Sequence, residues 1–376
     1  MATLCTAGGE EVSLRTNRAE FSRPLPLGDR SSHGVQAEIR VENGSAIVRT
    51  FSAFRSRLFG ALLVIPSLVQ AQAWLAPKGE GTVSLSYQNQ YVVDHVFENR
   101  DAYDIGHILS HALTLDLDYS LTDNLAVRAA LPFIAGKYYG PAPHQLTKDN
   151  GTYQSTFQDF VTDVRYRVTK GHVAITPFFR AVIPSNSYPY FAHSAAGRDQ
   201  REYHLGTNFG RRLDPWIPRA YIQAQYSYAF VERVLGIAPN RSNAEFQLGY
   251  LLTPRISLLA TGQGMYTHRG LDLNINLFQV GLSDEQWIHH DQIAKTSLLD
   301  LGGGTSVSIT PSWQMFLTFA RSVEGRNGHL HAAIVTIGVS RSFGTKPPVE
   351  KTSLGLRGEP GPEANRPVVC TCSKTR

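Results

Sequence analysis

Charged residues occupy alternate positions within otherwise apolar stretches of this 376-residue chain. Carboxylates and guanidiniums with such spacing form ion pairs, or they attract a passing solute of opposite charge. A buried charge is costly unless it is paired or hydrated. Both readings stay open from the sequence: a salt-bridge network that braces a wall, and a basic stripe that orients an anionic or polar solute. The candidates are Asp116, Asp118, Arg128, Asp163, Arg165, Arg167, Arg180 and Glu245.

The elements that must position these charges show a period of two from Gly81 onward. In the stretch ALTLDLDYSL, for example, Leu113, Leu115 and Leu117 share one face, and Asp116 and Asp118 share the other. Strict alternation over seven to twelve residues predicts β-strands with one apolar and one polar face. About twelve such strands are expected, the last ending at Phe343.

A soluble antiparallel sandwich also alternates, so further features must decide the fold class. The predicted strands approach the roughly 9–11 residues of a tilted membrane strand. Short connections at 121–124, 168–171, 252–255 and 309–312 alternate with long polar ones at 94–108, 134–156, 184–201, 231–241, 267–295 and 322–330. Aromatic residues also recur at strand ends. These features favour an all-β fold, a transmembrane antiparallel up-and-down β-barrel.

Composition supports this class. Charged residues make up only 18% and aromatic residues 10% of the chain, while the mean hydropathy is slightly negative. The net charge of +5 resides in the chain ends: residues 1–57 hold eight basic and six acidic residues, and residues 344–376 hold six and three. The body between them has 22 of each, with no basic patch interleaved with aromatics, so nucleic acid is not an expected partner.

A secretory signal is predicted within residues 48–73. Arg55 and Arg57 precede an apolar run from Leu58, and Ala71-Gln72-Ala73 follows as a cleavage motif. We expect cleavage after about Ala73, with residues 1–47 as a disordered extension from a start assigned too far upstream. The barrel should span residues 74–343, and residues 344–376 read as a disordered tail.

Histidines gather in the predicted long loops and adjoining strand ends, which hold His95, His107, His111, His144, His193, His204, His268, His289, His290, His329 and His331. Imidazole is a common metal ligand, but no tight H-x-x-x-H spacing recurs on one element. Loop decoration is therefore favoured over metal capture, and neither a metal nor another cofactor is expected. The three cysteines lie in the chain ends, so the body has no thiolate site.

Motifs of outer-membrane hydrolases are missing from the sequence: it has no G-x-S-x-G, no H-E-x-x-H and no P-loop. The glycine-rich LGGGTS beginning at Leu301 lies in an alternating stretch, where glycines let a strand bend or a loop pack closely. The chain is therefore not expected to be an enzyme.

Two stretches carry a family resemblance: SLTDNLAVRAALPFIAGKYYG from Ser120, and FQDFVTDVRYRVTKGHVAITPFFRAVIPSNSY from Phe157. They resemble outer-membrane transporter-like proteins of the MetA pathway of phenol degradation, relatives of long-chain fatty-acid channels. The matching elements are an apolar strand ending in Pro-Phe, Asp159 before an Arg-Tyr-Arg strand, and a strand that closes in Ile-Pro. The resemblance implies uptake of small, often aromatic or hydrophobic compounds.

Together these observations predict an outer-membrane channel for passive uptake of small molecules. Its expected partners are the lipid bilayer, a small-molecule solute, and the barrel-assembly machinery, which would recognise the last strand ending at Phe343. Two alternatives stay open: an envelope or adhesion barrel without transport, and an outer-membrane hydrolase.

Overall fold

The computed structural model describes residues 73–141, 143–169, 171–273 and 283–344. All of them belong to one compact unit, residues 62–376. The predicted extension at 1–47 lies outside the described residues, as do the predicted signal at 48–73 except for Ala73 and the predicted tail at 344–376 except for Gly344.

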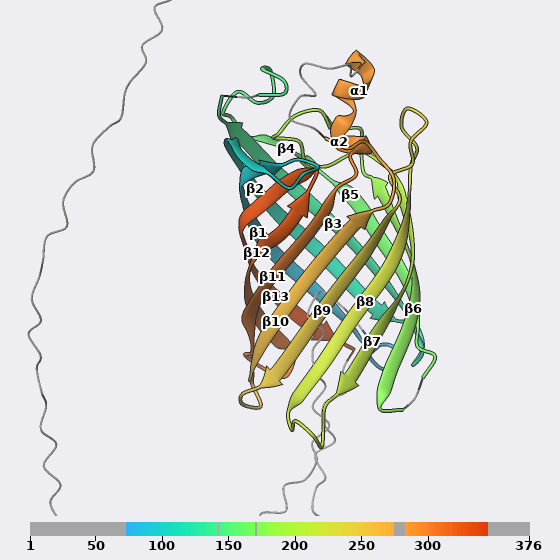
Figure 1. Ribbon diagram of the computed structural model, residues 1–376. Helices are drawn as coiled ribbons and strands as arrows, with labels where there is room; N and C mark the ends of the chain where they lie inside the picture. The colour runs from blue at the N-terminus through green and yellow to red at the C-terminus, as the bar shows by residue number, and fades with distance from the viewer. Residues whose placement is uncertain (1–72, 142, 170, 274–282, 345–376) are drawn as a thin grey trace, which may run out of the picture. The chain divides into compact units, whose positions relative to one another are not determined.

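A single antiparallel sheet accounts for the described strands, and it closes on itself (Figure 1). Its first strand, β1, pairs with the last strand, β13, as well as with β2. The short segments β4 and β5 follow each other directly and both pair with β3, so they are two halves of one strand. The predicted twelve-stranded barrel is thereby confirmed. The strands are β1 (Gly81–Val96), β2 (Ala102–Ser120), β3 (Leu125–Tyr139), β4 (Gln154–Phe157), β5 (Asp159–Tyr166), β6 (Val173–Pro184), β7 (Glu202–Arg212), β8 (Ala220–Val231), β9 (Arg241–Leu251), β10 (Ile256–Thr267), β11 (Ser297–Ser308), β12 (Trp313–Arg326) and β13 (Gly328–Phe343).

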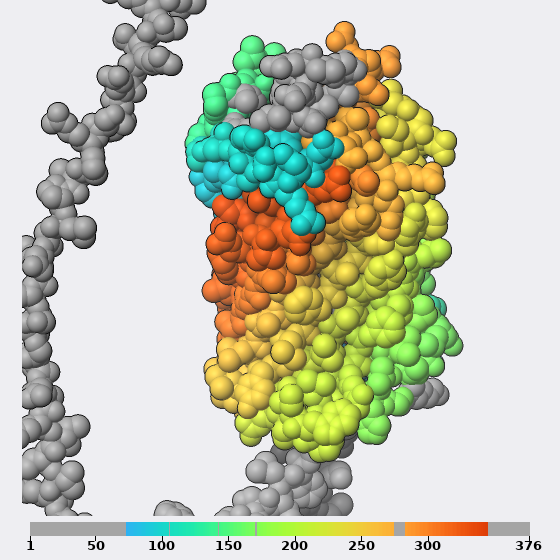
Figure 2. Space-filling model, in the orientation of Figure 1, coloured from blue at the N-terminus to red at the C-terminus, as the bar shows by residue number. Residues whose placement is uncertain are grey.

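Alternation along each strand separates an apolar outer wall from a polar interior. On β2, Leu115 is 56% exposed on the outside, whereas Asp116 and Asp118 are buried on the inside. The same outward exposure of large apolar residues recurs on other strands, as at Leu205, Leu248 and Leu317. On the face drawn in Figure 2, the colours of successive strands follow one another across the wall. Exposing an apolar surface of this extent to water is unfavourable.

Strands extend further at the long-loop end than the sequence predicted. The expected loop 94–108 is largely strand, because β1 runs to Val96 and β2 begins at Ala102. The prediction of a loop at 322–330 is wrong for the same reason, since Asn327 alone separates β12 from β13. Backbone pairing continues there although the side chains no longer alternate between apolar and polar. Hydropathy therefore missed these strand ends.

The parity of the inward face changes once within the fourth strand, at Gln158. Phe157 pairs with Phe133, but Val161 pairs with Ala130, so the strand contains one extra residue there. Such a β-bulge re-aims side chains. Gln158 donates to the Ala196 carbonyl at 2.7 Å, and Asp159, the next residue, accepts from the Tyr188 hydroxyl. Two consecutive side chains therefore face the interior and hold the loop 185–201.

The long loop between β10 and β11 carries two short helices, α1 (Asp284–Ile288) and α2 (His290–Ile293), at the top of Figure 1. Ser283 caps α1 through a capping box with Gln286. Within the part of the chain that the structure describes, neither helix has the length and apolar character needed to cross a membrane.

Close packing between β11 and β12 depends on Gly302. A Cβ added to Gly302 would lie 2.1 Å from the Phe319 carbonyl oxygen. We expect Gly302→Ala to lower stability by about 1–3 kcal/mol, because backbone must shift to admit the methyl group. The matched control is Gly264→Ala on β10, where the nearest atom is at 3.7 Å. The measurement is the temperature at which the folded band changes its mobility on a gel; equal temperatures for both variants would contradict this packing argument.

Candidate functional site: the barrel interior

Charges of alternating sign face one another across four neighbouring strands inside the barrel. The register pairs Asp118 with Arg128, Arg128 with Asp163, and Asp163 with Arg180. Asp163 is at the centre: its carboxylate lies 3.6 Å from Arg128 Nη1, 3.0 Å from Arg165 Nε and 3.4 Å from Arg180 Nη2. Cross-strand pairs of opposite charge stabilise a sheet. We call these residues, with Asp116, the ion-pair network.

The remaining contacts complete this network. Arg128 Nε donates to Asp116 Oδ2 at 2.7 Å, and Arg165 pairs with Asp118. Three aspartates thus compensate three arginines, and the Asp163 and Arg165 side chains are 1% and 3% exposed. Such burial makes pairing necessary for each charge. The geometry is that of a wall brace, the first of the two readings left open by the sequence.

Two predicted residues occupy different places. Arg167 lies beyond the end of β5, where its Nη2 donates to the Asp123 carbonyl at 2.7 Å in the short turn after β2. The alternation was extended one position too far, because β5 ends at Tyr166. Glu245 on β9 contacts the network only through Gln225, whose Nε2 donates to Glu245 Oε1 at 3.3 Å while its Oε1 accepts from Arg180 at 3.4 Å.

Residues 73–80 cross the interior at the short-turn end, which the sequence did not predict. Ala73 N–H donates to Gln223 Oε1 at 3.1 Å, and Thr176 Oγ1 donates to the Ala73 carbonyl at 2.7 Å. Trp74 packs edge-on against Tyr221, with ring centroids 6.1 Å apart. These partners point inward from β6 and β8, while Gly79 N–H binds the Ser120 carbonyl across the barrel on β2. The segment therefore narrows that mouth.

The loop 185–201 fills the interior at the opposite end. Its His193 ring stacks on Tyr138, a wholly buried inward residue of β3, at 4.5 Å. A Cβ added to Gly136 would lie 2.8 Å from the Ser194 carbonyl oxygen, so glycine is required for this close approach. Asp149 binds the loop from the neighbouring connection, since it accepts from the N–H groups of His193 at 3.0 Å and Ser194 at 2.9 Å.

Asp149 is itself suited to this role. Burial raises the pKa of its carboxyl, but the N–H donors of Ser194 and His193 outweigh burial and hold the pKa below its usual range. The carboxylate thus stays ionised and keeps two connections together. A single aspartate in a polar loop gives no periodic signal, which is why the sequence did not point to it.

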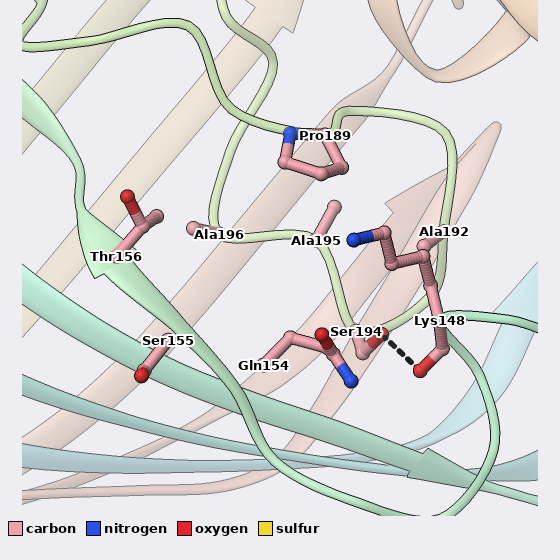
Figure 3. A pocket seen from close by; sticks show the side chains of 9 residues that line it. All are labelled: Lys148, Gln154, Ser155, Thr156, Pro189, Ala192, Ser194, Ala195 and Ala196. Carbon is pink, nitrogen blue, oxygen red and sulfur yellow. Dashed lines mark hydrogen bonds between the residues drawn. The ribbon is translucent and has the colours of Figure 1, made fainter.

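A small pocket of about 430 Å³, partly open to solvent, lies between these two connections (Figure 3). Its lining is made of small and polar side chains, among them Gln154, Thr156 and Ala195, with Lys148 at one side. A hydrogen bond of 3.3 Å from Ser194 Oγ to the Lys148 carbonyl closes one edge. The pocket offers hydrogen bonds but no group of residues arranged for catalysis.

Ser322, His331 and Asp300 lie close together inside the barrel. Ser322 Oγ donates to Asp300 Oδ1 at 2.6 Å and accepts from the His331 backbone N–H at 2.8 Å. His331 Nδ1 lies 3.1 Å from Asp300 and 3.4 Å from Ser322 Oγ. In a catalytic triad the serine and the aspartate bind opposite ring nitrogens. Here both face Nδ1, so the grouping is a structural hydrogen-bond cluster.

The class of protein that the fold defines is a closed antiparallel β-barrel with twelve strands. No protein-family model and no curated protein matches the sequence. An outer membrane channel from Pseudomonas putida F1 has a similar structure: the TM-score is 0.57 at 14% identity, over 74% of this chain and 100% of that one. At this identity the likeness shows the fold.

Two further solved structures are less similar. The KdgM porin aligns at 9% identity and a TM-score of 0.37, over 70% of this chain and 99% of that one. A deletion mutant of TodX, a monoaromatic hydrocarbon channel, aligns at 9% identity and a TM-score of 0.36, over 71% and 91%. Scores this low add no argument about function.

The ion-pair network predicts a large effect of one substitution. Asp163→Ala removes the carboxylate that Arg128, Arg165 and Arg180 share and leaves buried positive charge uncompensated. We therefore expect the free energy of unfolding to fall by about 3–5 kcal/mol. The control is Glu324→Ala, which breaks a solvent-exposed pair with Arg100 at 2.9 Å and should cost at most about 1 kcal/mol. Urea unfolding in detergent measures both; a similar small loss for both variants would show that the network does not brace the wall.

Proposed function

We propose that this chain is an outer-membrane channel for passive uptake of small molecules. The observation that carries the proposal is the separation of an exposed apolar outer wall from a polar, charged interior in a closed barrel. A closed barrel leaves no unpaired strand edge, which the hydrocarbon of a bilayer requires. Short turns at one end and long loops at the other are typical of bacterial outer-membrane barrels.

The chemistry of the interior favours transport over a purely structural barrel. Replacing a buried ion pair by well-packed apolar residues is often neutral or stabilising. A barrel that served only as an anchor would therefore gain little from charges at Asp118, Asp163 and Arg180. A path for a hydrated solute, in contrast, needs polar groups along its wall. The alternative of an adhesion or envelope barrel draws its support from the loops that cover the mouth.

The proposed solute class follows from two sources. The resemblance to proteins of the MetA pathway of phenol degradation supports aromatic or hydrophobic compounds. The interior supports solutes that also carry a polar or anionic group, because guanidinium and amide donors line it. Small aromatic acids satisfy both conditions, and a neutral sugar of similar size is the comparison in a liposome-swelling assay.

Conductance in planar bilayers tests the channel itself. Because residues 73–80 and the loop 185–201 narrow the two mouths, we expect low conductance from the intact protein. Deleting residues 189–196 removes the plug formed by His193 and Ser194, and the conductance should rise several-fold. The control is a deletion of residues 145–147 in the connection after β3, which leaves Asp149 in the chain. If neither the intact protein nor the 189–196 deletion conducts, the channel proposal fails and the envelope barrel is favoured.

We also propose export by a signal peptide, with a refined cleavage site. The sequence places cleavage after about Ala73, but Ala73 is wholly buried and binds Gln223 and Thr176. Cleavage after Ala71, which follows Val69-Gln70, retains those contacts. Mass spectrometry of the mature N-terminal peptide is expected to begin at Gln72. A peptide that begins at Trp74 would favour the original site, and an intact Met1 would contradict export with cleavage.

A further inference from the structure

Histidines that are far apart in the sequence meet above the interior at the long-loop end. We define the histidine cluster as His95, His144, His193, His290 and His329. The ring centroids of His144 and His193 are 3.7 Å apart, those of His144 and His290 are 4.8 Å apart, and His329 joins His193 to His95 at 5.4 and 4.8 Å. They come from two strand ends and three separate connections, which is why no sequence spacing revealed the cluster.

Three side chains in this region bring possible metal ligands close together. His144 Nδ1 lies 3.6 Å from Asp291 Oδ2, and His290 Nε2 lies 3.4 Å from Asp291 Oδ1. The ligand atoms of His144, His290 and Asp291 all lie within 4.8 Å of one another. In a tetrahedral zinc site with bonds of about 2.0–2.1 Å, neighbouring ligand atoms are roughly 3.3 Å apart. The distance from each histidine nitrogen to its nearer Asp291 oxygen is close to that spacing, although the two distances involve different oxygens of the carboxylate.

The His290 ring is oriented as a ligand would be. Its Nδ1 lies 2.7 Å from the Trp287 carbonyl oxygen, which can only accept, so Nδ1 carries a proton and donates. Metal-bound histidines commonly donate their second ring nitrogen in this way, which fixes the tautomer. With Nδ1 engaged by this carbonyl, Nε2 is the ring nitrogen that faces the Asp291 carboxylate, and a metal ion could bind to both.

His144 supplies an independent indication. Its side chain is 7% exposed, and its Nδ1 is buried without a hydrogen-bond partner among the described residues. An unsatisfied polar atom in such a position is costly. The backbone N–H of His144 donates to Asp149 at 3.0 Å, so the same carboxylate that fixes the loop 185–201 also fixes this residue. Phe191 stacks on the His144 ring at 5.4 Å and limits its movement.

We propose that His144 Nδ1, His290 Nε2 and the Asp291 carboxylate bind one divalent transition-metal ion of the zinc type, with a water as fourth ligand. Two imidazoles and one carboxylate are a donor set that such ions favour. His144 belongs to the connection after β3 and His290 to α2. The bound ion therefore links two connections that lie over the mouth, and it holds them as a cross-link would.

The test uses the full mature protein in detergent, purified without a polyhistidine tag. Titration calorimetry with Zn²⁺ should give one ion per chain, and Co²⁺ should give the intense visible absorption of a four-coordinate ion. We expect His290→Ala and Asp291→Asn each to weaken Zn²⁺ binding by about 100-fold or more. His268→Ala is the control, because that exposed loop histidine contacts Ser242 and Tyr228 rather than the cluster. It should bind as the parent does.

The outcomes separate clearly. Heat-modifiable mobility confirms that each variant is a folded barrel before its binding is compared. Unchanged Zn²⁺ binding in both ligand variants, or no binding in the parent at millimolar Zn²⁺, would overturn the proposal. The Zn²⁺ binding measurement does not depend on whether the protein conducts. Its result is therefore independent of the planar-bilayer test of the channel.

Discussion

The pairing of β1 with β13 is the constraint on which the rest of the structure depends. It runs from Gly81 opposite Phe343 to Val96 opposite Gly328, and it satisfies the last free backbone edge of the sheet. Because side chains alternate along every strand, closure fixes one set of residues inside and the other outside around the whole barrel. Register shifts interrupt this alternation locally, and the one at Gln158 within the fourth strand changes which side chains face inward. At that point Gln158 and Asp159 of the barrel wall form hydrogen bonds with the loop 185–201.

The sequence could predict what depends on this alternation. Strand identity, the apolar wall and the inward positions of Asp116, Arg128 and Asp163 follow from a period of two, which is a local property. The pairing of Asp116 with Arg128 follows from the adjacency of consecutive strands. Strand ends were less accessible, because the polar extensions of β2 and β12 lose the apolar signal while they keep their backbone pairing. Arg167 was misplaced for a related reason: the pattern continues into the turn although the strand does not.

The segments that narrow the two mouths could not be predicted from a sequence pattern. Single contacts from residues without periodicity hold those segments, as Tyr188 does through Asp159 and Ala73 through Thr176. The histidine cluster is a similar case, since its members are assembled by the folding of three connections. The sequence pattern placed eleven histidines in loops and adjoining strand ends but did not predict that any of them share a binding site. The interior network, in turn, is neutral in sum, with three aspartates and three arginines, so it presents alternating charge and not a uniform basic stripe.

In the proposed channel a solute would have to pass both narrowed mouths, and different sets of contacts hold the segments that narrow them. Residues 73–75 are fixed by two hydrogen bonds and one ring contact, which together amount to about 3 kcal/mol. The loop 185–201 is held by Asp149, Asp159, Gln158 and the packing of His193 on Tyr138, and it moves only when these buried polar contacts break together. If the chain is the proposed channel, the long-loop end is therefore the tighter barrier, and the contacts that fix its loops control how readily a solute enters.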